Sequence, residues 1–504
     1  MMPSLAIFPL LLPLVLVILG ALTTLVFEPY LRGEAKHGLP PWIAAAFLVA
    51  AAVAQALAPS GHLQGLYAMD GARLWLCEAI LIASLCSIAG LQTSLGRDRF
   101  AGGEAYPLVL FATAGALLMA MSADLLALFL ALEITSLPIY ALVGLRRHRQ
   151  ESNEALFKYF IMGAVFSAIF LYGVALTYGA TGGLALGRPM LPGREGVFWI
   201  GQTFIVIGLL FKVGAVPFHF WVPDVYTGAP VAVTGFMAAV VKVGGFAALG
   251  SLWLHLLAVV SRTIQPGTVV DLGQAVTLTQ AGKITPVVGA LQTAFLAMAL
   301  LSIFLGNMGA LRQTSVRRLL AYSAIAHAGY MLLAFSLPIG ESLALGSLWF
   351  YLTSYAIASA GTLAALAMIS GKNDQGDDVS SLAGQGRSDP FLGVVLTVFL
   401  ASLAGIPVTM GFLGKFLVLA ELVTKGHVAI AVFAVLMAVV GAAYYLRLLV
   451  ALWAVPGRDP IARGPSLLGR WTLAAAAVAV VVLVAFPRIL VHPPHVDPVA
   501  VSTP

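Results

Sequence analysis

Charged side chains are scarce in this chain, and their scarcity indicates that most of the chain lies in a lipid bilayer. Asp, Glu, Lys and Arg make up 10% of the 504 residues, whereas hydrophobic residues make up 60%. Soluble domains carry about 25% charged residues, so this composition excludes an ordinary soluble enzyme. Apolar stretches long enough to cross about 30 Å of hydrocarbon predict an all-α polytopic membrane protein with about fourteen spans. Their centres lie near residues 13, 49, 83, 114, 134, 167, 210, 241, 298, 326, 356, 405, 440 and 480.

Cysteine and the familiar cofactor motifs are also nearly absent. Cys77 and Cys86 are the only cysteines, and both fall in the third predicted span without a CxxC pattern. This pair excludes an iron–sulfur ligand set of the chain's own and argues against a structural disulfide. The sequence has no GxGxxG opening a helix after a strand, no P-loop and no His or Cys cluster at metal-ligand spacing. We therefore predict that the chain binds no cofactor itself.

The first apolar segment and the loop charges predict the orientation. The stretch from Leu5 to Leu22 has no basic region before it and no small-residue cleavage site after it, so we interpret it as a retained span rather than a signal peptide. Basic residues gather in the loops after odd-numbered spans, which predicts that both termini lie outside the inner membrane of a bacterial cell. These residues are Arg32, Lys36, Arg97, Arg99, Arg146, Arg147, Arg149, Arg312, Arg317, Arg318, Lys372, Arg387, Arg458, Arg463 and Arg470. The net charge of +6 thus reflects topology and not a surface for nucleic acid.

Two predicted spans are interrupted by proline beside small residues. The seventh contains Lys212–Pro217 and the twelfth contains Ala404–Pro407. Because the breaks lie five spans apart, we predict two inverted five-helix repeats, spans 4–8 and 9–13, with broken helices 7 and 12. The alternative is that each proline makes only a packing kink. The predicted divisions are a three-helix segment at 1–104, the repeats at 105–255 and 283–455, and a C-terminal helix and tail at 456–504.

Charged residues inside the predicted spans are the candidates for function. They are Glu133, Lys158, Lys212, Lys242, Lys415 and Arg447. Each costs roughly 2.5 to 3.5 kcal/mol at the centre of a bilayer, so a chain that keeps several of them is expected to use them. Burial disfavours an ammonium and a nearby carboxylate favours it, so Glu133 and Lys212 are predicted to form a protonation switch. A static salt bridge is the alternative. Arg447 does not release its proton and is predicted to be a structural anchor.

A line of ionisable groups continues beyond this pair. Lys242 lies mid-span in the eighth helix, where no acidic residue of the same span neutralises it. Ser323, His327 and Tyr330 share one face of the tenth span, and Lys415 follows the break in the twelfth. In chain order these groups predict a proton path along the middle of the membrane. For His327, a core histidine with satisfied hydrogen bonds is the alternative.

Motifs around these residues resemble the antiporter-like membrane subunits of respiratory complex I, NADH-quinone oxidoreductase. The matching stretches are Asn153–Phe160, Leu171–Gly173, Phe211–Trp221, Pro223–Tyr226, Gly228–Pro230, Leu320–Ser323, Ile325–Tyr330, Leu403–Pro407 and Gly411–Phe412. They follow one another in a single order, and the context of Lys158 and the lysine at position 415 resemble the subunit N type within this family.

The resemblance implies a proton-translocating subunit that works through lysine and glutamate half-channels. Glu133 and Lys212 would be its coupling pair, Lys242 the connector, Lys415 the terminal proton site, and Lys158 a further charged group near the first half-channel. It also implies other antiporter-like and small membrane subunits as partners in the lipid bilayer. NADH, FMN, iron–sulfur clusters and quinone would be bound by such partner subunits, where the redox chemistry takes place.

The chain departs from this family in two places. Thr227 stands where an acid usually precedes a Gly-Ala-Pro turn, and the predicted eleventh span, 349–367, has no histidine or lysine. A link from Lys242 to Lys415 is therefore predicted to use His327, hydroxyl groups and water. Two other functions stay open from the sequence: a subunit of a multisubunit cation/proton antiporter, and a non-conducting membrane scaffold.

Overall fold

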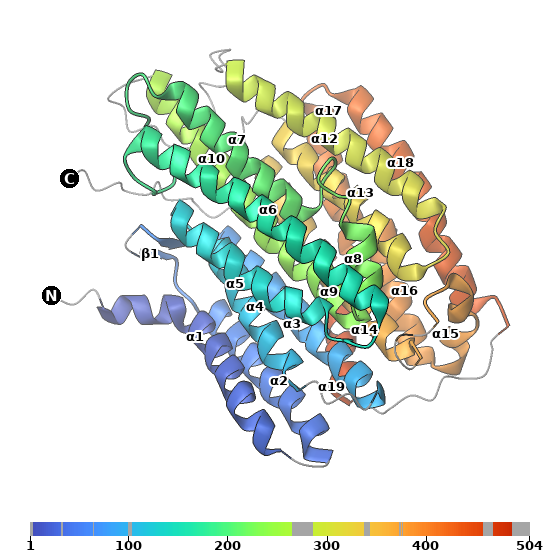
Figure 1. Ribbon diagram of the computed structural model, residues 1–504. Helices are drawn as coiled ribbons and strands as arrows, with labels where there is room; N and C mark the ends of the chain where they lie inside the picture. Colours follow the sequence, from blue (N-terminus) through green and yellow to red (C-terminus); the bar gives the residue numbers. More distant parts are fainter. Residues whose placement is uncertain are drawn as a thin grey trace.

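The structure, a computed structural model, is a bundle of long helices (Figure 1). It describes residues 4–31, 34–63, 65–98, 103–264, 286–336, 343–371, 374, 376–456 and 467–485. The elements up to residue 264 are α1 (Ser4–Phe27), η1 (Glu28–Tyr30), α2 (Glu34–Ala56), β1 (Gly61–Leu63), β2 (Tyr67–Met69), α3 (Gly71–Asp98), α4 (Ala105–Met121), α5 (Leu125–Val143), α6 (Gln150–Thr181), α7 (Glu195–Val213), α8 (Val222–Gly228), α9 (Val231–Phe236), η2 (Met237–Val241) and α10 (Lys242–Ile264). The elements from residue 286 onward are α12 (Pro286–Leu311), α13 (Val316–Ser336), α14 (Leu343–Ile369), η4 (Val379–Leu382), α15 (Gln385–Ser388), α16 (Pro390–Ala404), α17 (Met410–Thr424), α18 (Val428–Trp453), α19 (Leu467–Val482) and η5 (Leu483–Ala485).

The predicted all-α membrane fold is confirmed, with one small exception. Twelve helices among the described residues are long and apolar enough to cross a membrane. Of the remaining two predicted spans, the one near residue 114 coincides with the shorter apolar helix Ala105–Met121, and the one near residue 405 is divided between the shorter apolar helix Pro390–Ala404 and α17. The exception is an antiparallel hairpin in which Gly61 of β1 pairs with Met69 of β2. Fourteen crossings and the inverted symmetry of the repeats stay predictions.

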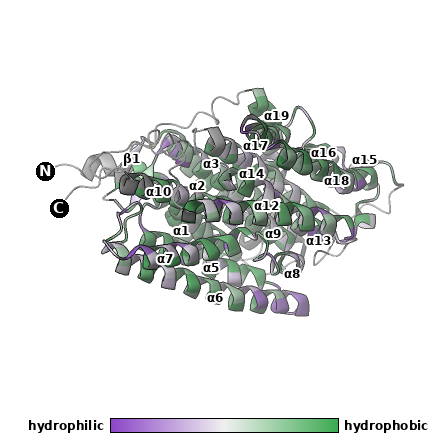
Figure 2. Cartoon of the chain, turned by 90° about the horizontal axis from the view of Figure 1, so that it is seen from above, coloured by the Kyte–Doolittle hydropathy of each residue, from purple (hydrophilic) through white to green (hydrophobic). Residues whose placement is uncertain are grey.

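Two helical segments occupy the interior of the bundle. Every residue in the most apolar window of Val231–Leu257, and likewise of Leu345–Ile369, is buried, compared with 28% in Gln150–Thr181. The second of these segments, α14, packs against α3, α9, α13, α16 and α17. Figure 2 shows that α6 (Gln150–Thr181) lies at the outside and is hydrophobic along most of its length, with hydrophilic residues toward one end. Polar groups on α10 and α14 are therefore shielded from lipid by protein.

Both predicted helix breaks are present. Helix α7 ends at Val213 and α16 ends at Ala404, and each is followed by a glycine in the left-handed conformation, Gly214 with φ 71° and Gly405 with φ 85°. Glycine adopts this conformation without steric cost, and a proline a few residues later keeps the helix from continuing. Each break leaves backbone carbonyls without helical partners in the apolar interior, so side chains must supply donors.

A local widening of the helix precedes Lys242. Residues Met237–Val241 form one turn of π-helix, η2, between α9 and α10. A π-turn inserts one residue into the helical spacing and so rotates the side chains that follow it. This turn therefore sets the direction in which the side chain of Lys242, the first residue of α10, points away from the helix axis.

The connection after α14 joins the two predicted repeats. The Asp374 carboxylate accepts hydrogen bonds from the Arg146 guanidinium and, at 3.0 Å, from the backbone N–H of Val231 at the start of α9. The Asp377 carboxylate accepts from Arg317 Nε of α13 at 2.8 Å. Carboxylates at helix N-termini are favoured by the unpaired N–H groups there. The loop therefore holds the start of α9 and the start of α13 through its two carboxylates.

Removing the Asp374 carboxylate is expected to destabilise this junction. Its side chain is fully buried and that of Arg146 is 11% exposed, so Asp374→Ala removes one member of a buried ion pair. We expect a loss of about 3 to 5 kcal/mol, as for other buried pairs that lose one member. The measurement is thermal unfolding of the purified, detergent-solubilised complex. Asp378→Ala, which removes an exposed acid from the same loop, is the matched control. Equal unfolding temperatures for both variants would contradict the assignment.

Candidate functional site

Lys212 lies in an enclosed polar site formed by three helices. Its side chain occupies the last turn of α7 and the residue is 3% exposed. The ammonium donates a hydrogen bond to Ser136 Oγ of α5 at 2.6 Å and lies 3.5 Å from the Tyr159 hydroxyl of α6, with the ring centroid of Tyr159 at 5.5 Å. An ammonium over an aromatic ring is stabilised by the negative face of the ring. Lys212 is thus held by neutral groups.

Glu133 is a neighbour of Lys212 and does not form an ion pair with it. It lies one turn before Ser136 on α5 and is partly buried, and its Oε1 atom is enclosed without a hydrogen-bond partner. The acceptor that Lys212 contacts on α5 is Ser136. Glu133 lies on the same helix as Ser136, the residue that Lys212 contacts. The alternative of a static salt bridge is therefore not what the structure shows.

Lys242 lies deep between α10, α13 and α14. It is 2% exposed, and its ammonium donates to the backbone carbonyl of Ala324 in α13. The ring centroid of Tyr355 in α14 lies 5.4 Å from Nζ. A carbonyl has two lone pairs, so Ala324 can accept from Lys242 as well as from its own helix. As with Lys212, the neighbours in direct contact are neutral.

His327 joins the surroundings of two lysines. Its ring centroid lies 4.9 Å from that of Tyr355, which lies beneath Lys242, and 6.4 Å from that of Tyr330 on the next turn of α13. Tyr330 in turn lies beneath Lys415, with 5.6 Å between Nζ and the ring centroid. Lys242, Tyr355, His327, Tyr330 and Lys415 therefore follow one another in space, and the predicted proton link through the eleventh span stays a prediction.

Both ring nitrogens of His327 have hydroxyl partners. Nδ1 lies 2.7 Å from the Tyr351 hydroxyl of α14, and Nε2 lies 3.2 Å from the Tyr445 hydroxyl of α18. Tyr445 also hydrogen-bonds Ser323, one turn before His327 on α13. A hydroxyl can donate or accept, so both neutral tautomers of the imidazole are accommodated. Two residues of the predicted polar face, Ser323 and His327, thus share one hydrogen-bonded cluster, whereas the Tyr330 hydroxyl donates to the Ala434 carbonyl of α18.

Lys415 is a residue of α17, and its side chain reaches the break in the second repeat. Its ammonium donates to the carbonyls of Leu403 at 2.8 Å and Ala404 at 3.2 Å, the last residues of α16. These are carbonyls that the break leaves without helical partners. A Cβ atom at Gly405 would approach Lys415 Cδ to 3.2 Å, so the glycine makes room for the lysine as well as for the turn. In the first repeat the indole of Trp221 donates to the Phe211 carbonyl at 3.1 Å, and this carbonyl also accepts from the N–H of Gly214.

Lys158 differs from the other three lysines. Its side chain is 37% exposed and forms ion pairs with Glu154 at 2.6 Å and Asp224 at 3.0 Å. Asp224 in α8 also pairs with Arg318 of α13. Burial opposes ionisation of Asp224, but the hydrogen bonds from Lys158 and Arg318 outweigh it and hold the pKa of the carboxyl below its usual range. Lys158 is thus neutralised in a partly exposed network.

Arg447 is placed as an anchor, as predicted. Its guanidinium donates to the backbone carbonyls of Leu311 and Gln313 at the end of α12.

The sequence did not lead us to Glu78, an acid inside α3 whose Oε1 atom is buried without a hydrogen-bond partner. It was detectable as a lone acid in an apolar run. Cys77 and Cys86 are both buried and free. Within the described ranges, no group of three or more His, Cys, Asp or Glu is arranged to hold a metal ion.

Comparison with known proteins decides the family. The sequence pattern of the family described as NADH:quinone oxidoreductase/Mrp antiporter, TM, matches residues 122–266 and 257–441. Subunit N of NADH-quinone oxidoreductase from Salinibacter ruber is 36% identical over 425 residues, which are 81% of this chain and 79% of that protein. The chain belongs to the NADH-quinone oxidoreductase subunit N family.

Solved structures agree with membership of the subunit N family. A chain in the respiratory complex I of Thermus thermophilus with bound aureothin superposes with a TM-score of 0.76 at 33% identity, covering 95% of this chain and 98% of that one. A chain of the Mrp complex from a Dietzia species superposes with a TM-score of 0.75 at 18% identity, covering 97% and 96%. At 18% identity, the likeness to the Mrp chain is one of fold alone.

Proposed function

We propose that this subunit N family member is a proton-translocating subunit in the membrane arm of NADH-quinone oxidoreductase. The observation that carries the proposal is that three lysines are enclosed in the interior and that a hydrogen-bonded cluster around His327 lies between two of them, Lys242 and Lys415. Each lysine is enclosed, and its direct partners are neutral oxygens and aromatic rings. In an interior of low dielectric, a group held in this way changes its charge in response to modest changes around it.

In the proposed cycle, Glu133 controls Lys212 through its charge rather than through contact. Lys242 then connects the two repeats, His327 relays between the hydroxyl groups of Tyr351 and Tyr445, and Lys415 is the terminal site. Lys158 contributes charge near the first half-channel. The inverted repeats and the placement of both termini outside the bacterial inner membrane belong to the same proposal. Its energy would come from NADH oxidation and quinone reduction in partner subunits, which would hold the FMN, iron–sulfur clusters and quinone.

Protons fit this site better than metal cations do. A protonated lysine has no lone pair to offer a metal, whereas it can gain and release its own proton. The competing function is that of a subunit of a cation/proton antiporter, because an Mrp complex chain shares the fold. A non-conducting scaffold is opposed by three lysines kept in the interior where apolar residues would pack at lower cost.

Purification through a tag on this chain separates the two transport functions. We expect the isolated complex, reconstituted in vesicles, to move protons when NADH reduces quinone, at a rate unchanged when K⁺ replaces Na⁺. The reason is that each enclosed lysine offers donors only. Proton movement that requires Na⁺ and proceeds without any NADH-linked activity would favour the antiporter instead.

A further inference from the structure

A water-sized cavity lies between α6, α7, α10 and the loop that joins α6 to α7. We call it the loop cavity, and its polar lining residues are Thr177, Thr181, Arg188, Gln202 and His255. None of these residues belongs to the proposed proton relay. His255 lies about 20 Å along α10 from Lys242, so the loop cavity is also separate from that relay in space.

Two walls of the loop cavity are fixed by the fold. The Leu125 N–H at the start of α5 donates to the Leu184 carbonyl at 2.8 Å and so holds the loop in place. On the other side α6 and α7 pack closely, because a Cβ atom at Gly201 would lie 2.7 Å from the Thr177 hydroxyl oxygen. Walls held in this way are formed before a ligand arrives, which lowers the entropy that binding costs.

A buried glutamine supplies an unpaired acceptor to the loop cavity. Gln202 is 3% exposed, and its Nε2 atom donates to Thr177 Oγ1 at 3.1 Å. The Thr177 hydroxyl donates its one proton to the Gly173 carbonyl at 2.9 Å, so it can only accept from Gln202 and thereby orients the amide. The Oε1 atom of Gln202 is buried without a hydrogen-bond partner among the described residues. Because an unpaired buried acceptor is costly, an occupant that donates to Oε1 is favoured.

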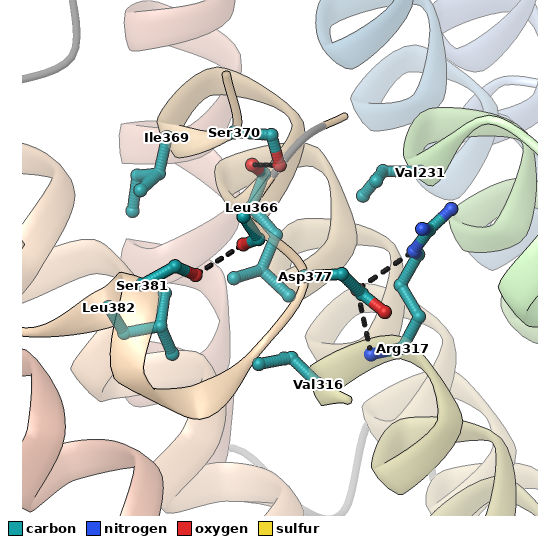
Figure 3. A pocket seen from close by; sticks show the side chains of 10 residues that line it. Val231, Val316, Arg317, Leu366, Ile369, Ser370, Asp377, Ser381 and Leu382 are labelled. Carbon is teal, nitrogen blue, oxygen red and sulfur yellow. Dashed lines mark hydrogen bonds and ion pairs between the residues drawn. The ribbon is translucent and has the colours of Figure 1, made fainter. Parts of the chain in front are cut away.

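Arg188 supplies an unpaired positive charge at the same cavity. The residue is exposed, and its guanidinium lies over the backbone of Gly183, where a Cβ atom would collide with Nη1. It forms no ion pair with any residue that the structure describes. The cavity between α9, α13 and α14 differs, because there the guanidinium of Arg317 is paired with Asp377 (Figure 3). A guanidinium without an acid is suited to a phosphate, which it binds through parallel N–H groups.

The surface around the loop cavity is apolar and exposed. Tyr178 follows the lining residue Thr177 on α6, Leu191 lies in the loop, and Ile200 lies on α7. Exposed apolar side chains on a membrane helix face lipid chains, and tyrosine is typical of the level of the headgroups. Because α6 ends at Thr181, the cavity lies where this helix leaves the hydrocarbon, at the depth of the lipid headgroups.

We propose that the loop cavity binds the headgroup of a phospholipid that ends in a primary amine, phosphatidylethanolamine. The phosphate pairs with Arg188, and the ammonium enters the cavity and donates to Oε1 of Gln202. An ammonium carries three donors and is about the size of a water molecule, so it matches both the acceptor and the space. The trimethylated amine of phosphatidylcholine has no N–H group and is too large for the cavity. The acyl chains lie along the exposed apolar surface of α6 and α7.

Lipid competition at this site tests the proposal in the wild-type complex. A phosphatidylethanolamine probe with a photoreactive acyl chain is added to purified complex, and its cross-links to residues 172–205 of this chain are counted by mass spectrometry. We expect unlabelled phosphatidylethanolamine to displace the probe about tenfold better than phosphatidylcholine does, because only the former makes the charge-assisted hydrogen bond to Gln202. O-Phosphoethanolamine, which has the headgroup without acyl chains, should compete at least tenfold less well than the lipid. Equal competition by this soluble compound would overturn the assignment to a lipid.

Two variants separate the roles of the phosphate and the amine. Both lipids carry a phosphate, so Arg188→Gln should weaken competition by both about tenfold. Gln202→Met keeps the volume of the side chain and removes the acceptor, so it should abolish only the preference for phosphatidylethanolamine. The controls are Arg194→Gln, in the same loop, and Gln55→Met, a buried glutamine of α2; neither residue lines the loop cavity, and neither variant should change the competition.

The methylated series of the lipid keeps the test decisive if a variant does not assemble. Each methyl group added to the amine removes one donor and adds bulk, so competition in the wild-type complex should fall stepwise to the level of phosphatidylcholine. Equal competition across the series would overturn the proposal. So would a wild-type preference for phosphatidylethanolamine that persists unchanged in assembled Gln202→Met complex.

Discussion

Lys212→Met should reduce NADH-driven proton translocation by about tenfold or more, since a positioned acid–base group commonly contributes that much or more to a proton transfer. Methionine has nearly the length of lysine and is apolar, so it fills the space beside Ser136 and Tyr159 while offering no proton. The assay is the initial rate of vesicle acidification by assembled complex. Packing is expected to survive because no buried salt bridge is broken.

Two further variants refine this result. Lys425→Met removes a lysine at the end of α17, outside the proposed relay, and should leave the rate unchanged. Glu133→Gln keeps the shape of the side chain and removes its charge, so it should slow translocation less than Lys212→Met does. The double variant should be no slower than Lys212→Met alone, because Glu133 acts only through that lysine. Normal acidification by assembled Lys212→Met complex would exclude Lys212 as a proton carrier.

The breaks and the charged line could be predicted because they depend on local chemistry. Proline and glycine specify where α7 and α16 end, whatever surrounds them. Likewise, a lysine within an apolar run is costly in any arrangement of helices. These features need only the sequence around each residue.

Side-chain partners could not be predicted, because they depend on how distant helices pack. The sequence predicted a protonation switch between Glu133 and Lys212, but it did not indicate that Ser136 of the same helix would accept the hydrogen bond from Lys212. The pairing of Tyr445 with His327 joins helices more than a hundred residues apart. The π-turn before Lys242 and the docking of Asp374 also have no clear signal in the sequence.

The depth of Lys158 in the membrane could not be predicted by counting apolar residues along the sequence. Helix α6 has 32 residues, or about 48 Å, which exceeds the roughly 30 Å of hydrocarbon. Its first turns therefore extend beyond the membrane core, where Lys158 finds Glu154 and Asp224. A surface pair of this kind is worth about 0 to 1 kcal/mol, so the residue is inexpensive to keep.

Lys242→Met is expected to have the other large effect. Lys242 is the only one of the three enclosed lysines positioned between the repeats, on α10 and against Tyr355 of α14. Without it, protons supplied to one repeat have no ionisable group through which to reach the other. Methionine keeps the volume of the side chain and forfeits only the hydrogen bond to the Ala324 carbonyl, which retains its partner within α13.

The central claim is that protons cross this chain through Lys242. The most direct test is the number of protons moved per NADH oxidised, measured in vesicles containing assembled wild-type or Lys242→Met complex. A relay through Lys242 predicts a lower number for the variant, or a matching tenfold loss of both activities if the complex is strictly coupled. The wild-type number at the wild-type rate would contradict it.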